Sequence, residues 1–301
     1  MQDRENTLTF TVPPSFDDRT VQDFLRQHCH LSWRMVVKLK RVENGILLNG
    51  VHVRTIDRVH AGQTVQVTMP ADEVALEPVD MPLSVIFEDG YLLVVNKPPF
   101  LAVHPSAGKP EPTLANAVVA YFTAAGTPLH FRPISRLDRN TSGLLPIAKN
   151  SHIAFAMAGA IHKTYFAIVK GRLEGAGTIH APIRIREGSA ITREVGEGGK
   201  DSITHWESVC ADDDISLLRV TLETGRTHQI RVHLSHIGYP LVGDTVYGTD
   251  ETLPRHALHC ARLIFDHPVS GQKTEIAANI PDDMRGLLTR HFGNIEEYIH
   301  D

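Results

Sequence analysis

The spacing of apolar residues near the start of the chain predicts two short helices. The first follows Thr20, a residue type that caps helices, and the second follows Ser32 in the same way. Both have apolar positions at the three- and four-residue intervals of one helical face. The positions expected to face inward are Val21, Phe24 and Leu25 in the first helix and Trp33, Val36, Val37 and Leu39 in the second.

After these helices the pattern changes to that of strands. The run GILLNGVHV predicts two short strands about a tight turn at Asn49-Gly50, a dipeptide that readily adopts positive φ. The run AGQTVQVTM predicts a further turn and strand. We therefore expect a small α+β domain within residues 1–70.

Residues 68 to 83 (TMPADEVALEPVDMPL) separate this unit from the rest of the chain. They contain four acidic residues, three prolines and no basic residue. Proline removes backbone donors and like charges repel one another, so this composition favours an extended linker. We place the linker at residues 71–84 and expect a second, larger domain over residues 85–301.

The larger region combines helical and strand patterns. TLANAVVAYF has the pattern of an amphipathic helix, and near-alternating strands recur at GLLPIAK, YFAIVKG and SLLRVTLE. Alternation predicts antiparallel strands with one solvated face. The expected fold is α+β, with a mixed, largely antiparallel sheet, flanking helices and a central cleft. Residues 186 to 202 are Gly-rich and charged, which predicts a mobile loop or a loose hairpin.

Composition narrows the class of protein. Of 301 residues, 42% are hydrophobic, enough for buried cores, and no apolar run is long enough to cross a membrane. The N-terminal residues lack the layout of a signal peptide. Cys29, Cys210 and Cys260 are odd in number and far apart, which favours a reducing, cytoplasmic location over disulfides or a zinc site.

One loop carries a carboxylate between two guanidinium groups. In RLDRNTSG, Asp138 lies between Arg136 and Arg139, and Gly143 closes a turn into an apolar strand. Nearby positive charge favours the ionised carboxylate, so Asp138 is a candidate nucleophile or electrostatic anchor. The alternative is an exposed ion pair beside a tight turn. When this motif is considered alone, that alternative is the favoured interpretation.

A predicted helix further along offers fixed cations. In TGRTHQIRVHLSHIG, Thr227 can cap a helix that Gly238 ends, with Ile230, Leu234 and Ile237 as its buried stripe. The adjacent stripe holds His228, Arg231 and Ser235, and Arg226 lies just ahead of the helix. Arginine stays charged and binds carboxylate or phosphate as a fork. A purely structural salt bridge in a core helix remains an alternative.

The histidines of this helix also raise the question of a metal site. His228, His233 and His236 lack the i, i+4 spacing of a helical zinc pair, and no acidic ligand lies near them in sequence. Structural or substrate-contacting histidines are the favoured interpretation, and we expect no metal.

Three elements in this order, the third of which carries two motifs, resemble those of the RluA-type pseudouridine synthases over almost all of residues 83 to 281. The family signature HRLDxxTSG appears as SRLDRNTSG, with Ser135 in place of the histidine. KxYxAxVxG matches residues 163–171, TGRxHQIRVH matches 224–233, and GxPLxGDxxYG matches 238–248. The substitution at Ser135 puts a neighbouring contact in doubt but not the carboxylate.

The resemblance implies roles for individual residues. Asp138 would be the catalytic carboxylate, Tyr165 would lie against the target base, and Arg231 would pair with Asp138. Leu241 occupies the place of an apolar residue that lines the uracil pocket. Arg136 would fill the gap left by the flipped nucleotide or hold a phosphate, and Arg226 and His228 would contact substrate. The isomerisation of uridine needs no redox change, so neither cofactor nor metal is implied.

The N-terminal unit resembles the S4 RNA-binding domain in its basic helix, NG hairpin and GQ-x-V strand, over most of residues 19 to 69. This stretch holds eight Lys or Arg against three Asp or Glu, although the whole chain has a net charge of -5. The cations expected to meet RNA phosphates are Arg34, Lys38, Lys40 and Arg41. A small domain with a merely solvated basic helix is the alternative.

The sequence therefore predicts a stand-alone synthase that isomerises uridines in structured rRNA or tRNA, and the family suggests a monomer. Two other functions were weighed. A noncatalytic RNA-binding or ribosome-assembly protein is disfavoured by the intact set of Asp138, Tyr165 and Arg231. A glycoside or nucleoside hydrolase would need a second acid, and none accompanies these motifs. Which RNA and which uridine are modified is left open.

Overall fold

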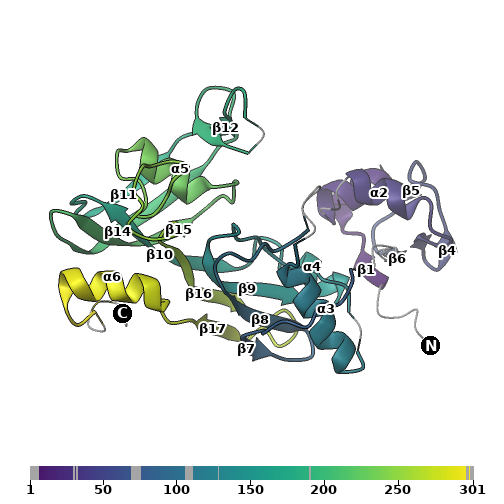
Figure 1. Ribbon diagram of the computed structural model, residues 1–301. Helices are drawn as coiled ribbons and strands as arrows, with labels where there is room; N and C mark the ends of the chain where they lie inside the picture. The colour runs from purple at the N-terminus through teal and green to yellow at the C-terminus, as the bar shows by residue number, and fades with distance from the viewer. Residues whose placement is uncertain are drawn as a thin grey trace. The chain divides into compact units, whose positions relative to one another are not determined.

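The computed structural model describes residues 7–29, 31, 33–68, 76–105, 111–127, 129–189, 191–295 and 298 (Figure 1). The chain divides into two compact units. The first comprises Met1–Ala75 with Asn150–Phe155, and the second comprises Leu76–Lys149 with Ala156–Asp301. Ser32, residues 71–75 of the expected linker and the side chain of Arg34 lie outside the described residues. The expected division into domains remains a prediction.

The first unit combines short helices with a small antiparallel sheet. Its four-stranded sheet has the order β1 (Thr7–Thr11), β6 (Thr64–Thr68), β3 (Ile46–Leu48) and β4 (Val51–His52). A second pair joins β2 (Arg19–Thr20) to β5 (Arg58–Val59). The helical segments are η1 (Pro14–Phe16), α1 (Val21–Asp23), the π-helical turn η2 (Phe24–His28), α2 (Trp33–Leu39) and α4 (Ser151–Ala156).

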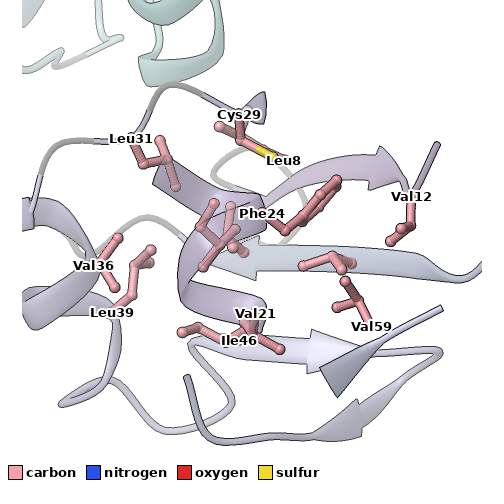
Figure 2. Packing of buried hydrophobic residues seen from close by; sticks show 13 residues of the cluster. Leu8, Val12, Val21, Phe24, Cys29, Leu31, Val36, Leu39, Ile46 and Val59 are labelled. Carbon is pink, nitrogen blue, oxygen red and sulfur yellow. The ribbon is translucent and has the colours of Figure 1, made fainter. Parts of the chain in front are cut away.

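Local signals in this unit act as the sequence predicts. The Thr20 hydroxyl accepts a hydrogen bond from the backbone N–H of Asp23 at 3.1 Å, which caps α1. Asn49 and Gly50 have φ of 49° and 81°, the left-handed values that a two-residue hairpin turn requires. Figure 2 shows Phe24, Val36 and Leu39 directed into the unit's hydrophobic cluster.

Trp33 differs from its predicted place. It was expected on the inner side of α2 with Val36, but 49% of Trp33 is exposed, whereas Val36 and Leu39 are fully buried. Trp33, Val36 and Leu39 are spaced three residues apart, which is less than one full helical turn. Successive apolar positions therefore shift around the helix axis. The core reaches only the later positions, and the indole faces solvent.

The second unit is built on one large sheet. Within the described residues nine strands form it, and only the pairing of β16 with β9 is parallel. The order is β11 (Ala176–His180), β14 (Ile203–Ala211), β15 (Ile215–Leu222), β10 (His162–Lys170), β16 (Leu258–Asp266), β9 (Ser142–Ala148), β8 (Leu92–Lys97) and β7 (Val85–Glu88). The ninth strand, β17 (Lys273–Ala277), pairs with β16. The predicted α+β fold with a largely antiparallel sheet is confirmed.

Three helices and a separate hairpin accompany this sheet. The helices are α3 (Leu114–Ala124), α5 (Gln229–His236) and α6 (Asp282–Phe292). The hairpin pairs β12 (Ile183–Ile185) with β13 (Arg193–Val195), so the charged segment at 186–202 holds the second strand of a hairpin whose first strand precedes it. None of the helices in the described part of the chain has the length and apolar character needed to cross a bilayer.

Both faces of the central strands are covered. Phe166 and Ile168 of β10 pack with Met284 and Leu288 of α6 in one hydrophobic cluster. Side chains alternate along a strand, so Tyr165 points to the opposite face from Phe166. All seven residues of β9 are buried. The expectation of one solvated face is therefore wrong for β9, because the sheet is sandwiched there.

Gly143 allows the closest backbone approach in the sheet. It has φ of 113° and is the register partner of Cys260, where β9 runs parallel to β16. A Cβ placed on Gly143 would lie 2.3 Å from the backbone oxygen of Cys260 and 2.5 Å from its nitrogen. No L-side chain fits without moving one of the two strands.

We expect Gly143→Ala to lower the free energy of unfolding by roughly 3 kcal/mol or more, because φ strain adds to a backbone collision. Gly126→Ala is the matched control, since Gly126 also has positive φ but nothing within 4 Å of its added Cβ. That control should lose only about 1–2 kcal/mol. Urea unfolding of both variants measures the difference, and equal losses would show that the close approach is unimportant.

Candidate active site

The loop that carries Asp138 is held in place by contacts with a second segment, Arg255–Cys260. The Arg255 guanidinium, which is fully buried, donates to the backbone oxygen of Asn140 at 3.2 Å. The Thr141 hydroxyl and the His256 Nε2 lie 2.8 Å apart. With Gly143 against Cys260, the turn that follows Asp138 is fixed residue by residue.

Lys97, at the end of β8, fixes the same loop from another direction. Its Nζ donates to the backbone oxygens of Pro98, Leu101 and Arg139 at 2.8, 2.9 and 3.0 Å. Burial, with a smaller contribution from the Arg255 charge, lowers the pKa of Lys97 to about 7, while Asp138 opposes this shift. Three carbonyl acceptors match the three donors of an ammonium group, so this geometry favours the protonated form.

Helix α5 begins in an unusual way that directs His228 toward Asp138. Thr227 was expected to cap this helix, but His228 is the N-cap residue, with a left-handed φ of 59°, and its side chain does not cap. Instead the Gln229 Oε1 accepts the backbone N–H of Arg226 at 2.9 Å. The His228 Nε2 consequently lies 3.8 Å from the Asp138 Oδ2. The helix ends at Ile237, immediately before Gly238, as predicted.

Arg231 lies between two carboxylates. Its Nε and Nη2 donate to Asp244 at 2.7 and 2.9 Å, and its Nη1 donates to the Asp138 Oδ2 at 3.3 Å. The side chains of Arg231 and Asp244 are 6% and 1% exposed, whereas that of Asp138 is 25% exposed. Arg231 is thus anchored by a buried fork and presents its remaining nitrogen to a carboxylate that solvent reaches.

Tyr247 completes this arrangement. The Arg231 guanidinium carbon lies 4.9 Å from the centre of the Tyr247 ring. The Tyr247 hydroxyl is 2.8 Å from the His228 Nδ1 and accepts the backbone N–H of Arg193 in β13 at 2.9 Å. Asp244 and Tyr247 both belong to the GDTVYG run, so one turn contacts both of the side chains that face Asp138.

Tyr165 lies deep in the sheet next to this site. Burial, together with the Cys260 thiol and the Asp138 charge, raises the pKa of Tyr165 well above its usual value of 10. Burial also raises the pKa of the Cys260 thiol to about 12. Both groups therefore stay protonated at neutral pH, and a phenolate at Tyr165 is disfavoured.

Other predicted site residues lie apart from this cluster. Arg139 was expected to flank Asp138, but its side chain pairs with Glu111 at 2.9 Å, because the turn directs it to solvent. Arg136 is exposed. The pKa of His104 is lowered first by burial and then by the positive charge of Arg136. The charges that face Asp138 come from elsewhere in the chain.

Arg226 and Leu241 occupy contrasting environments. Arg226 is exposed and donates from its Nε to the backbone oxygen of Asp201 at 3.1 Å. Leu241 is 1% exposed and forms an isolated bridge with Val169 of β10. The structure gives each of them a position, and their predicted contacts with substrate remain predictions.

The three histidines of α5 do not converge. His233 is buried between the Thr204 hydroxyl and the Ala181 backbone oxygen, both 2.9 Å from its ring nitrogens, while His236 is exposed. One other group among the described residues, Asp212, Asp214 and His291, brings potential ligand atoms within 4.8 Å of one another. The 2.7 Å contact between Asp212 and His291 accounts for this proximity.

Comparison with known proteins identifies the class. The family model for RNA pseudouridylate synthases matches residues 91–236. An uncharacterised RNA pseudouridine synthase of Bacillus subtilis, YjbO, is 36% identical over 269 residues, covering 86% of this chain and 94% of the relative. Ribosomal large subunit pseudouridine synthase D of Xylella fastidiosa is 36% identical over 264 residues, covering 81% and 80%.

A solved structure agrees with these relatives. Human RNA pseudouridylate synthase domain containing 1 has 30% sequence identity and a TM-score of 0.53, covering 68% of this chain and 86% of that one. The chain therefore belongs to the RluA-type RNA pseudouridine synthase family, and it is an isomerase of that type.

Sequence reasoning missed Asp244, Tyr247, Lys97 and Arg255 as parts of the site. Asp244 and Tyr247 both lie in the motif GxPLxGDxxYG, so the acid and the phenol of that motif were a usable signal. Lys97 lies outside all of these motifs, so no local signal marks it. Nothing in the local sequence around Arg255 marks it, because the Asp283 carboxylate and the Asn140 backbone oxygen that it binds lie 28 and 115 residues away.

The ion pair between Arg231 and Asp244 gives a prediction for stability. Burial alone would raise the pKa of Asp244, but the hydrogen bonds and charge of Arg231 lower it below 3.8. A lowered folded-state pKa stabilises the native state at pH above 3.8, and this contribution is lost as pH falls through the folded value. Removing the carboxylate leaves the buried Arg231 charge uncompensated on that side.

We expect Asp244→Asn to cost about 3–5 kcal/mol in urea unfolding at pH 7. The difference from the unsubstituted chain should shrink as the pH falls below about 4, where Asp244 of the unfolded chain becomes protonated, and it should keep shrinking down to the lower folded-state pKa. Exposed Asp213, 92% exposed and paired with Arg172, supplies the control Asp213→Asn, which should be nearly neutral. A pH-independent difference for Asp244→Asn would contradict the assignment of an ionised pair.

Proposed function

We propose that this chain isomerises specific uridines in rRNA or tRNA, with Asp138 as the catalytic carboxylate. The observation that carries the proposal is the position of Asp138, which is partly exposed while an anchored Arg231 faces it at 3.3 Å. The relative named ribosomal large subunit pseudouridine synthase D favours rRNA of the large subunit among the open substrates. The proposal also takes structured RNA as partner and the monomer as the active form.

The reaction breaks the N1–C1′ bond of uridine and forms a C5–C1′ bond. A carboxylate at C1′ serves either as a nucleophile or as the counter-charge of a sugar-centred cation. Arg231 holds Asp138 in place in both cases. In this proposal Asp138 needs no metal and no cofactor, since no electrons are exchanged.

Tyr165 acts in this proposal by packing against the flipped base. Its raised pKa supports a neutral phenol rather than a phenolate base. Leu241, buried beside β10, lines the apolar side of the uracil pocket. Exposed Arg136 and Arg226 contact the RNA backbone or fill the space that the flipped nucleotide leaves.

His228 presents a proton to Asp138. The Tyr247 oxygen already accepts the Arg193 N–H, so its own O–H needs an acceptor, and the His228 Nδ1 at 2.8 Å provides one. This leaves the hydrogen on the His228 Nε2, which faces Asp138 at 3.8 Å. Burial lowers the pKa of His228, which supports the neutral ring. Tyr247 is thus a positioning residue in this proposal.

The RNA-binding role of the N-terminal unit is also part of the proposal. Lys38, Lys40 and Arg41 are exposed at and just after α2 and are free to meet phosphates as an S4-like surface. Arg34, the fourth predicted cation, has a side chain outside the described part of the chain.

Asp138→Asn tests the catalytic role. It keeps the volume of the side chain and removes its charge, so isomerisation should fall about a thousandfold or more while RNA affinity is retained. Tritium release from RNA carrying 5-tritiated uridine measures the reaction, and a filter-binding titration measures affinity. Asp213→Asn should behave as the unsubstituted enzyme, and wild-type rates from Asp138→Asn would refute the role.

Tyr247→Phe tests the positioning of His228. The ring and its contact with Arg231 remain, but the hydroxyl that fixes the His228 ring is lost, so we expect kcat to fall about tenfold with little change in KM. Tyr121→Phe is the matched control, since it removes a phenol that donates to Glu88 at 2.7 Å. Nitrogen-15 shifts should show mixed His228 tautomers only in Tyr247→Phe. An unchanged tautomer and kcat would rule out the arrangement.

A further inference from the structure

The exposed face of α2 carries a large aromatic ring. Trp33 is 49% exposed, although its indole is among the largest apolar side chains and the neighbouring α2 residues Val36 and Leu39 are fully buried. Its position was the clearest failure of the apolar pattern in the N-terminal unit. A ring that folding leaves outside the core is available to a ligand.

Two cations lie beside the Trp33 ring. The Lys40 Nζ is 5.6 Å from the ring centre, and the Arg26 guanidinium carbon is 5.9 Å from it. Trp33 and Lys40 are seven residues apart, two helical turns along the same side, and Arg26 comes from η2. Two segments thus place a cation near one exposed indole.

These cations are not neutralised by the protein. In the part of the chain that the structure describes, Arg26, Lys38, Lys40 and Arg41 form no salt bridge. Elsewhere in the same unit Arg54 pairs with Asp57 at 3.2 Å, and Arg58 pairs with Asp18 at 3.0 Å. Two of these four cations, Arg26 and Lys40, are the ones that lie beside the Trp33 ring.

An exposed aromatic face with adjacent cations has the chemistry to bind single-stranded RNA. Every nucleobase has a π face that stacks on an indole, and the phosphates on either side attract the cations. Stacking on the indole is worth more free energy for a base than for an exposed cation. The base therefore displaces the cation from the ring toward the phosphate of the same nucleotide. A duplex offers phosphates but no accessible base face.

We propose that Trp33, flanked by Arg26 and Lys40, is a stacking platform for an unpaired nucleobase of the RNA substrate. This inference rests on the proposed RNA-binding role of the N-terminal unit and adds a base contact to its phosphate contacts. The platform selects RNA in which a single-stranded segment adjoins the structured part.

Fluorescence of Trp33 tests the contact directly. The chain has two tryptophans, so Trp206→Phe leaves Trp33 as the only indole. In the full-length chain, we expect a single-stranded 12-nucleotide oligoadenylate to quench this fluorescence, and a blunt RNA duplex with the same number of phosphates to leave it nearly unchanged. Equal quenching by both RNAs, or by neither, would overturn the platform.

Affinity separates stacking from charge. Trp33→Leu should weaken binding of the oligoadenylate about fivefold or more and leave the salt slope unchanged. Lys40→Ala should weaken binding of both RNAs and reduce the salt slope by about one. Arg54→Ala, which removes a cation already paired with Asp57, is the charge-matched control and should change neither.

Two outcomes distinguish the stacking platform from the proposed phosphate contacts on which it rests. If Lys40→Ala weakens binding but Trp33→Leu does not, the platform is wrong and the S4-like phosphate contacts stand. If neither variant changes affinity, both are wrong. Trp33→Phe keeps an aromatic face and should retain most of the affinity. Circular dichroism melts check that each variant folds.

Discussion

A buried guanidinium joins the parts of the second unit that form the candidate active site. Arg231 binds Asp244 as a fork at 2.7 and 2.9 Å and reaches Asp138 with its third nitrogen at 3.3 Å. Burying a cation is unfavourable unless it is fully paired, so Asp244 makes the position of Arg231 possible. The strands, the start of α5 and the turn after Asp138 are all arranged around this one charge.

Much of this arrangement follows from sequence. The Thr20 cap and the Asn49-Gly50 turn depend on residues within a few positions of each other, and both form as expected. Arg231 lies on the side of α5 that helical spacing predicts, whereas His228 faces Asp138 from the N-cap position, where its φ is left-handed. Resemblance to a family supplied the roles that spacing alone left open.

The remainder depends on contacts between distant parts of the chain. Arg139 is adjacent to Asp138 in sequence, but the turn sends it to Glu111, while Lys97 and Arg255 approach from 41 and 117 residues away. Trp33 shows the same limit, because an apolar residue at a helix start faces the core only if the core extends that far. The local pattern predicts which side of a helix or strand is apolar, but it does not predict how far the neighbouring core extends.

The hairpin of β12 and β13 is joined to the site through its main chain. The Tyr247 oxygen accepts the N–H of Arg193, so the position of the hairpin backbone helps to hold the Tyr247 hydroxyl in place. In the proposed mechanism, an RNA that moves this hairpin would by thermodynamic linkage also change the orientation of His228, because one amide joins the two.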